Sequence, residues 1–183
     1  MKILYQVAGK YILEEKQSAI DLENIIEKYN LKNKIEINEA FLFVKSGLDV
    51  KPYLDMEFSN FQLQEVRIGL KEGLDISLYA KSEYNWEQML LIRLGLESGF
   101  NIGLYAKPEF STSQMQQIFF GLRQNLNTSL YAKSEFSGKQ MEQIRLGLEQ
   151  GLDVESYLNS SVDWKEMRKI RWNLNRQKKE VIG

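Results

Sequence analysis

Basic residues gather near the C-terminus of this chain, and their types and spacing suit them to binding an anionic partner. Between Lys165 and Lys179 the sequence has one acidic residue, Glu166, and Trp164 and Trp172 lie among the cations. Lysine and arginine neutralise phosphates, and aromatic rings stack on nucleic-acid bases. The pattern therefore favours direct contact with DNA or RNA. The basic residues are Lys165, Arg168, Lys169, Arg171, Arg176, Lys178 and Lys179.

Two structural interpretations compete with this one. Cations near the end of a helix also complement the negative end of the helix macrodipole. The tryptophans can equally replace core residues, because Trp172 stands in register with four apolar residues earlier in the chain. These are Ile68, Leu94, Phe120 and Leu146.

A second set of charges recurs at a fixed spacing. Lys81, Lys107 and Lys133 are 26 residues apart. Such ladders usually mark a solvated face on which opposite charges are neighbours, and the alternative is a groove that grips a protein or a nucleic-acid backbone. The companion charges are Glu57, Glu83, Glu109 and Glu135, followed by Arg67, Arg93, Arg145 and Arg171.

Residues typical of catalysis are scarce. The chain has no histidine and no cysteine, so the commonest general base, the thiol nucleophile and the usual transition-metal ligands are missing. An all-carboxylate or Ser/Lys site has no recognisable pattern, and no glycine-rich phosphate loop occurs. We therefore predict a protein that is not an enzyme and that holds neither a metal nor a cofactor.

The elements that position these residues repeat along the chain. A fixed period of 26 residues marks units too small to bury their own apolar faces, which must stack on their neighbours. We interpret the tyrosine and methionine ladders as core, with stacking on a cofactor as the alternative. The ladders are Tyr53, Tyr79, Tyr105, Tyr131 and Tyr157, and Leu63, Met89, Met115, Met141 and Met167.

Each 26-residue repeat contains signals that start and stop a helix. A Ser, Asn or Asp followed three residues later by Gln or Glu predicts a capping box, as at Ser111 and Gln114. A helix with apolar residues at helical spacing follows. It ends at Gly99 or its equivalents, where positive φ is free of steric cost. The next stretch predicts a tight connection and a short second helix, with Leu78 and Tyr79 turned inward.

Four glycines lie inside the long helices, where glycine costs about 1 kcal/mol relative to alanine. We expect that a neighbouring backbone approaches closely at these positions and requires glycine. The last 26-residue repeat, which has no full repeat after it, has Asn173 there instead. The four are Gly69, Gly95, Gly121 and Gly147.

The N-terminal residues follow another pattern. Residues 1–16 contain two short apolar runs separated by Ala8-Gly9-Lys10, which favours a β-hairpin over the alternative of a secretory signal. From Ser18 the apolar spacing predicts an amphipathic helix that ends between residues 30 and 33. No apolar stretch of about 18 residues exists to cross a membrane. We expect a cytoplasmic protein.

The repeats also resemble a known class. QMLLIRLGLESG and QMEQIRLGLEQGLDVESY are similar to a repeat of proteins from bacterial mobile elements and gut Firmicutes, over about residues 37–176. In length and arrangement the chain resembles type II-A anti-CRISPR proteins. The resemblance implies a small non-enzymatic inhibitor that binds the RNA-guided type II CRISPR effector nuclease, with or without its guide RNA, and prevents cleavage of target DNA.

We therefore predict a mainly α fold with three regions. These are an N-terminal cap over 1–34, an α-solenoid-like array of about five helix-turn-short-helix repeats over 35–176, and a basic tail over 177–183. The leading function is stoichiometric inhibition of a type II CRISPR effector, and the alternative is a DNA- or RNA-binding regulator on a mobile element. The predicted binding residues are Lys81, Lys107, Lys133, Arg168, Lys169, Arg176, Lys178 and Lys179.

Overall fold

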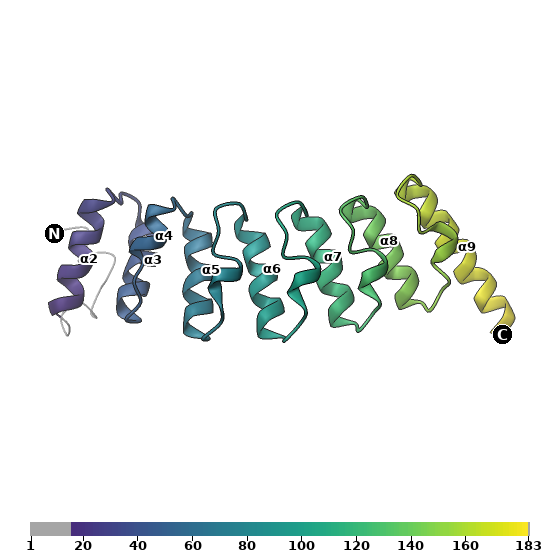
Figure 1. Cartoon of the computed structure of the whole chain (residues 1–183), viewed down its shortest axis with the longest axis horizontal. Coiled ribbons are helices and arrows are strands. Elements are labelled where there is room, and N and C mark those ends of the chain that lie inside the picture. The colour runs from purple at the N-terminus through teal and green to yellow at the C-terminus, as the bar shows by residue number, and fades with distance from the viewer. Residues whose placement is uncertain (1–15, 183) are drawn as a thin grey trace. The chain divides into compact units, whose positions relative to one another are not determined.

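A computed structural model describes residues 16–182, and every regular element within them is a helix (Figure 1). The prediction of a mainly α fold is confirmed for this part of the chain. The predicted β-hairpin falls almost entirely on residues 1–15, which lie outside the described residues. The chain divides into two compact units, Met1–Met89 and Leu90–Gly183, with the division inside helix α6. Each unit is described by itself below.

The first unit begins with α2 (Lys16–Lys28), the predicted amphipathic helix, whose Leu22 and Ile25 are buried. α2 packs on α3, and α3 packs on α5. Phe43, Leu63 and Tyr79 lie in the core of this unit. Its other elements are α3 (Lys34–Lys45), α4 (Lys51–Asp55), α5 (Asn60–Lys71), the 3₁₀ turn η2 (Ile76–Leu78) and the first residues of α6 (Trp86–Glu97).

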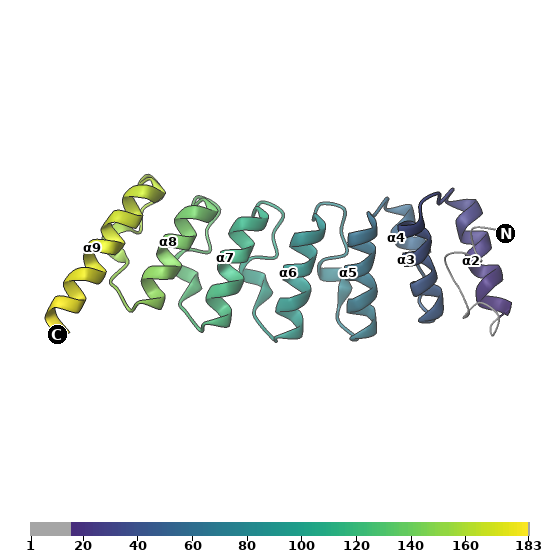
Figure 2. The ribbon, with the colours of Figure 1, turned by 180° about the vertical axis from the view of Figure 1, so that it is seen from behind.

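In the second unit α7 packs on α8 and α8 packs on α9, in an order that Figures 1 and 2 show from opposite sides. The core contains Tyr105, Met115, Tyr131, Met141 and Met167, all with 0% exposure. The elements after α6 are η3 (Ile102–Leu104), α7 (Thr112–Arg123), η4 (Thr128–Leu130), α8 (Gly138–Glu149), η5 (Glu155–Tyr157) and α9 (Trp164–Ile182).

The predicted capping boxes are confirmed at four helix starts. In α7 the Ser111 side chain accepts from the Gln114 backbone, and the Gln114 side chain accepts from the Ser111 N–H. The same Gln114 amide donates to the Phe136 carbonyl at 2.7 Å, so the cap also ties one repeat to the next. α9 differs, because Asp163 accepts from the Lys165 N–H while Glu166 pairs with Lys169. The other boxes join Ser59 with Gln62, Asn85 with Gln88, and Ser137 with Gln140.

The predicted helix stops are also confirmed. Gly99 has a φ of 68°, and Asn125, the one non-glycine residue of the series, has a φ of 54°. This left-handed conformation suits glycine and is tolerated by asparagine. Gly47, Gly73 and Gly151 have positive φ as well.

One local prediction was confirmed in part and another was wrong. The short second helix is α4 in the first repeat and a 3₁₀ helix of three residues in each of the next four, and Tyr79 is buried as predicted, but Leu78 is 39% exposed instead of turned inward. The helical glycines, moreover, face a side chain and not a neighbouring backbone. A Cβ at Gly95 would lie 1.9 Å from Tyr105 Oη, which donates to the Leu91 carbonyl at 2.9 Å. Glycine thus makes room for the buried tyrosine of the segment that follows.

The same contact recurs wherever the tyrosine is fully buried. Tyr79, Tyr131 and Tyr157 each approach the glycine ten residues earlier and donate to the carbonyl fourteen residues earlier. Tyr53 is the exception, because Phe43 occupies the glycine position and the two rings pack at 6.0 Å between centroids. Tyr53 is consequently only half-buried.

Candidate nucleic-acid interface

Helix α9 has 19 residues, whereas α5, α6, α7 and α8 have 12 each. The reason is visible in the sequence. Gly151, which has positive φ after the end of α8, is replaced in α9 by Gln177, and the helix continues. Residues 177–182, predicted as a separate tail, therefore belong to α9. The longer helix holds the C-terminal cations in one rigid row.

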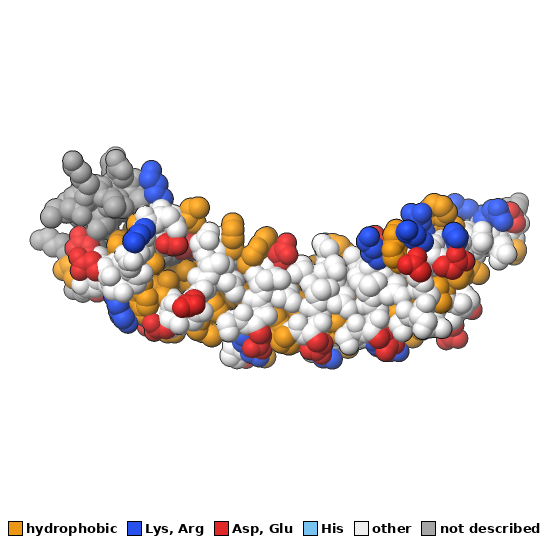
Figure 3. All heavy atoms as spheres, turned by 90° about the horizontal axis from the view of Figure 1, so that it is seen from above, with side chains coloured by type: hydrophobic (Ala, Val, Ile, Leu, Met, Phe, Trp, Pro, Cys, Tyr) orange, Lys and Arg blue, Asp and Glu red, His pale blue; other side chains and the backbone are white. Residues whose placement is uncertain are grey.

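The cations of α9 are divided between its two sides. Met167 and Arg171 are buried against the rest of the unit. With 3.6 residues per turn, the opposite side of α9 presents six exposed residues, which we call the α9 cationic face. Figure 3 shows Lys and Arg side chains gathered over this C-terminal end of the chain. The six residues are Lys165, Arg168, Lys169, Trp172, Arg176 and Lys179.

Two tryptophans bracket one arginine on this helix. The Arg168 guanidinium lies 5.5 Å from the centroid of the Trp164 ring and 5.0 Å from that of Trp172. Lys139 of α8 places its Nζ 4.8 Å from the Trp164 ring. Distances below about 6 Å are those of cation–π interactions. Trp164 is therefore surrounded by cations, while Trp172 remains 56% exposed.

Two carboxylates border the α9 cationic face. Glu166 pairs with Lys169 at 2.9 Å, and Glu180 lies 3.9 Å from Arg176. All four side chains are more than half exposed, so these pairs are of the surface kind that contributes little. Because the whole chain has a net charge of −1, the positive charge is concentrated here.

Three residues of the α9 cationic face replace residues that contact α9 from the preceding repeat. Lys165, Lys169 and Arg176 stand in register with Lys139 and Gln143 of α8 and with its C-cap residue Gln150. Arg168, Trp172 and Lys179 are outside this set of positions.

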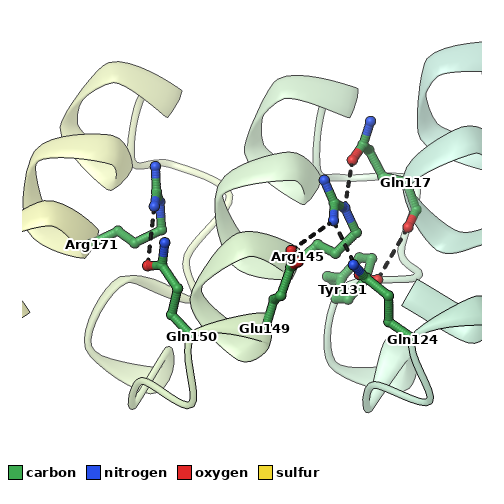
Figure 4. Close-up of polar contacts among 7 residues, drawn as sticks. All are labelled: Gln117, Gln124, Tyr131, Arg145, Glu149, Gln150 and Arg171. Carbon is green, nitrogen blue, oxygen red and sulfur yellow. Dashed lines mark hydrogen bonds and ion pairs between the residues drawn. The ribbon is translucent and has the colours of Figure 1, made fainter. Parts of the chain in front are cut away.

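The arginines that face neighbouring helices have a structural role (Figure 4). Arg145 donates to Gln117 at 2.9 Å and to Gln124 at 3.1 Å, and it pairs with Glu149 at 3.2 Å. Arg171 makes the equivalent bonds to Gln143 at 3.2 Å and Gln150 at 3.1 Å. In the first unit Arg67 pairs with Glu39 at 3.2 Å. These arginines join neighbouring helices within each unit, and their N–H groups are directed at those internal partners.

Lys178 also has an internal partner. Its Nζ donates to the Gln150 carbonyl at 2.8 Å and to the Gly151 carbonyl at 3.1 Å. These carbonyls lie at the C-terminal end of α8, where a cation complements the macrodipole. Lys178 thus caps α8 and does not belong to the α9 cationic face, although the sequence predicted it as a binding residue.

The predicted ladder of Lys81, Lys107 and Lys133 lies in the turns after the 3₁₀ segments. The backbone N–H of each lysine donates to the carbonyl of the preceding core tyrosine, at 2.8, 2.7 and 2.7 Å. Lys107 and Lys133 are exposed, Lys81 is half-exposed, and the Lys107 Nζ lies 5.8 Å from the Phe110 ring. The backbone of each lysine closes a turn, and none of the three lies on α9.

Sequence reasoning missed Lys139 as part of the site. It contacts Trp164, 25 residues later, and the same spacing joins Phe61 to Trp86 in the first unit, with ring centroids 5.3 Å apart. In both cases the second residue of one helix contacts the first residue of the next helix. The contacting residues are therefore 25 apart, although the repeat has 26 residues. That offset is the signal that identifies Lys139.

Among residues 16–182, no group of three or more acidic residues is placed to hold a metal ion. In the same range, no helix combines the length and apolar character needed to cross a membrane. No protein-family model, curated protein or solved structure matches this chain.

Proposed function

We propose that this protein is a non-enzymatic binding protein that contacts nucleic acid through the α9 cationic face. The supporting observation is the row of five exposed cations around an exposed tryptophan on one rigid helix. The row extends about 21 Å from Lys165 to Lys179 at 1.5 Å per residue. Over that length one strand of B-DNA presents about six phosphates. The length and sign of the row thus suit a polyanion.

Binding of labelled DNA and RNA oligonucleotides to the full chain, measured over a range of salt concentrations, tests this proposal. The logarithm of the association constant should fall linearly with the logarithm of salt concentration. A slope on the order of −3.5 for a single strand and −4.5 for a duplex is expected for five phosphate contacts. An affinity below detection at low salt would refute the proposal.

A second candidate is inhibition of a type II CRISPR effector nuclease, which the resemblance to anti-CRISPR proteins supports. Such effectors hold the guide RNA and target DNA in a positively charged channel. A cationic face is repelled by that channel but attracted by RNA exposed on the complex. The inhibitor would therefore bind the effector together with its guide RNA, in the bacterial cytoplasm.

Cleavage of a matched plasmid by effector and guide, with increasing amounts of the protein, separates the two candidates. An inhibitor blocks cleavage in proportion to its concentration and co-purifies with the effector. A regulator binds free DNA or RNA and leaves cleavage unchanged. Undiminished cleavage at large molar excess, across several type II effectors, would eliminate the inhibitor.

The proposal includes an architecture and the lack of turnover. We propose that residues 35–176 form an α-solenoid-like array of about five repeats, because the same tyrosine–glycine and arginine bonds recur in both units. Small-angle scattering that fits a compact sphere would contradict the array. Nuclease, hydrolase and acetyl-transfer assays of the purified protein should show no activity.

A further inference from the structure

We infer that the α9 cationic face binds single-stranded nucleic acid, with Trp172 as the surface on which a base stacks. The inference rests on the proposed function, because it specifies which nucleic acid the same face holds. Its independent observation is the exposure of Trp172, a residue that is 56% accessible. A row of cations alone requires no exposed aromatic ring.

Trp172 lies in the middle of the row. Arg168 precedes it by one helical turn and Arg176 follows it by one turn, so a cation stands about 6 Å away along the helix on either side. The Arg168 guanidinium is 5.0 Å from the Trp172 ring centroid and helps to hold the ring in place. A base on Trp172 would thus have cations for the phosphates on both sides of it.

The form of the nucleic acid follows from what a ring on a helix surface can reach. In a duplex the flat faces of the bases are stacked on one another, and the outside presents phosphates and sugars. Single strands can turn a base outward, and stacking of that base on an aromatic side chain is tolerant of sequence. An exposed indole therefore adds affinity for a single strand and adds little for a duplex.

Trp172 is more exposed than its equivalents in the two preceding repeats. Leu146 and Phe120 occupy the same register position and are half-buried, whereas Trp172 is 56% exposed. In α9 this position therefore presents an indole beside the cations.

The test compares one oligonucleotide as a single strand and as a duplex, using the full chain and its Trp172→Leu variant at the same low salt. Leucine preserves the helix and an apolar side chain but removes the stacking surface. The variant should bind the single strand about 5- to 150-fold more weakly, the range for loss of one stacked base. Its duplex affinity and its salt slope should be unchanged, and Trp86→Leu, in the other unit, should change neither affinity.

A variant with Trp86→Phe and Trp164→Phe leaves Trp172 as the single tryptophan and gives a second readout. Its fluorescence should be quenched by the single strand and not by poly-glutamate at equal charge. Equal affinities for single strand and duplex, with no effect of Trp172→Leu, would overturn the inference and leave the proposed function standing. Failure to bind either nucleic acid would overturn both.

Discussion

At the scale of single residues, the most informative contact is the one between a buried tyrosine and a helical glycine. Tyr105 Oη donates to the Leu91 carbonyl, and it can reach that carbonyl only because Gly95 has no side chain. The Leu91 carbonyl lies within α6, and this helix continues without a break past the residue that accepts the bond. Position 43 shows the consequence of losing the glycine, because there Phe43 leaves Tyr53 half-buried.

Gly95→Ala should therefore destabilise the protein, although alanine is the better helix former by about 1 kcal/mol. The new Cβ would lie 1.9 Å from Tyr105 Oη. In a Tyr105→Phe background, which lacks that oxygen, the same substitution should cost less, with a coupling on the order of 1 kcal/mol. Urea denaturation of the four proteins gives the coupling. Strictly additive effects would show that the hydroxyl is not the reason for the glycine.

The buried tyrosines also predict how stability depends on pH. Burial raises the pKa of Tyr157 from its ordinary value of 10.0 to about 12, and it raises the pKa values of Tyr105 and Tyr131 as well. In the unfolded chain these tyrosines ionise near pH 10. The free energy of unfolding should be unaffected by them below pH 10, then fall as the pH rises from 10 through the raised pKa values.

Denaturant unfolding followed from pH 8 to about pH 11.5, together with the ultraviolet absorbance of tyrosinate, measures this dependence. Tyr157→Phe should show a shallower loss above pH 10, because phenylalanine does not ionise. A stability that is flat between pH 10 and 11.5 would mean that the rings are not buried in solution.

At the scale of elements, successive helices are joined by pairs of residues 28 apart in sequence. The pair is Gln117 with Arg145 between α7 and α8, at 2.9 Å. One repeat earlier the same two positions hold Leu91 and Phe119, which are both buried. Both residues of the pair thus differ between the two repeats, one pair being polar and the other apolar. In neither repeat is an arginine or a glutamine paired with an apolar side chain.

Arg145→Phe by itself should destabilise the protein by about 1 to 3 kcal/mol, because it leaves the Gln117 amide without its donor in a half-buried place. Adding Gln117→Leu reproduces the Leu91 and Phe119 pair and should recover at least half of that loss. Thermal and urea melts of both variants check the prediction. A double variant no more stable than Arg145→Phe would show that the two positions are independent.

At the scale of the whole molecule, the basic residues near the C-terminus have two roles. Arg171 and Lys178 hold α9 against α8 through bonds to Gln143, Gln150 and Gly151. The α9 cationic face has no comparable bonds to α8. A variant that neutralises all the cations together would therefore confuse loss of binding with loss of structure.

The two roles can be separated by substitution. Changing the five cations of the α9 cationic face to glutamine should weaken nucleic-acid binding at low salt by at least about 100-fold and leave the melting temperature almost unchanged. Lys178→Met should do the reverse, with affinity within about threefold and a loss of about 0.5 to 1 kcal/mol in stability. Fluorescence anisotropy and thermal melts measure the two effects. Equal loss of binding in both variants would contradict the assignment of Lys178.

Most of the local structure was determined by the sequence. The capping residues, the positive-φ positions and the tyrosine and methionine ladders are short-range signals, because each depends on residues within one turn or on a strict period. Ser111 with Gln114, Gly99 and Tyr105 all lie where these signals put them. The concentration of cations between Lys165 and Lys179 was likewise evident in the sequence.

Only the tertiary structure decided which cation does what. Spacing along the chain does not reveal that Lys178 reaches the end of α8 while Lys179 faces solvent, since one residue of a helix turns the side chain by about 100°. The reason for the glycines was decided in the same way. Gly95 meets a hydroxyl ten residues further along, and that meeting depends on how the 3₁₀ turn folds back on the helix. Such contacts are set by packing in three dimensions, which a sequence period does not contain.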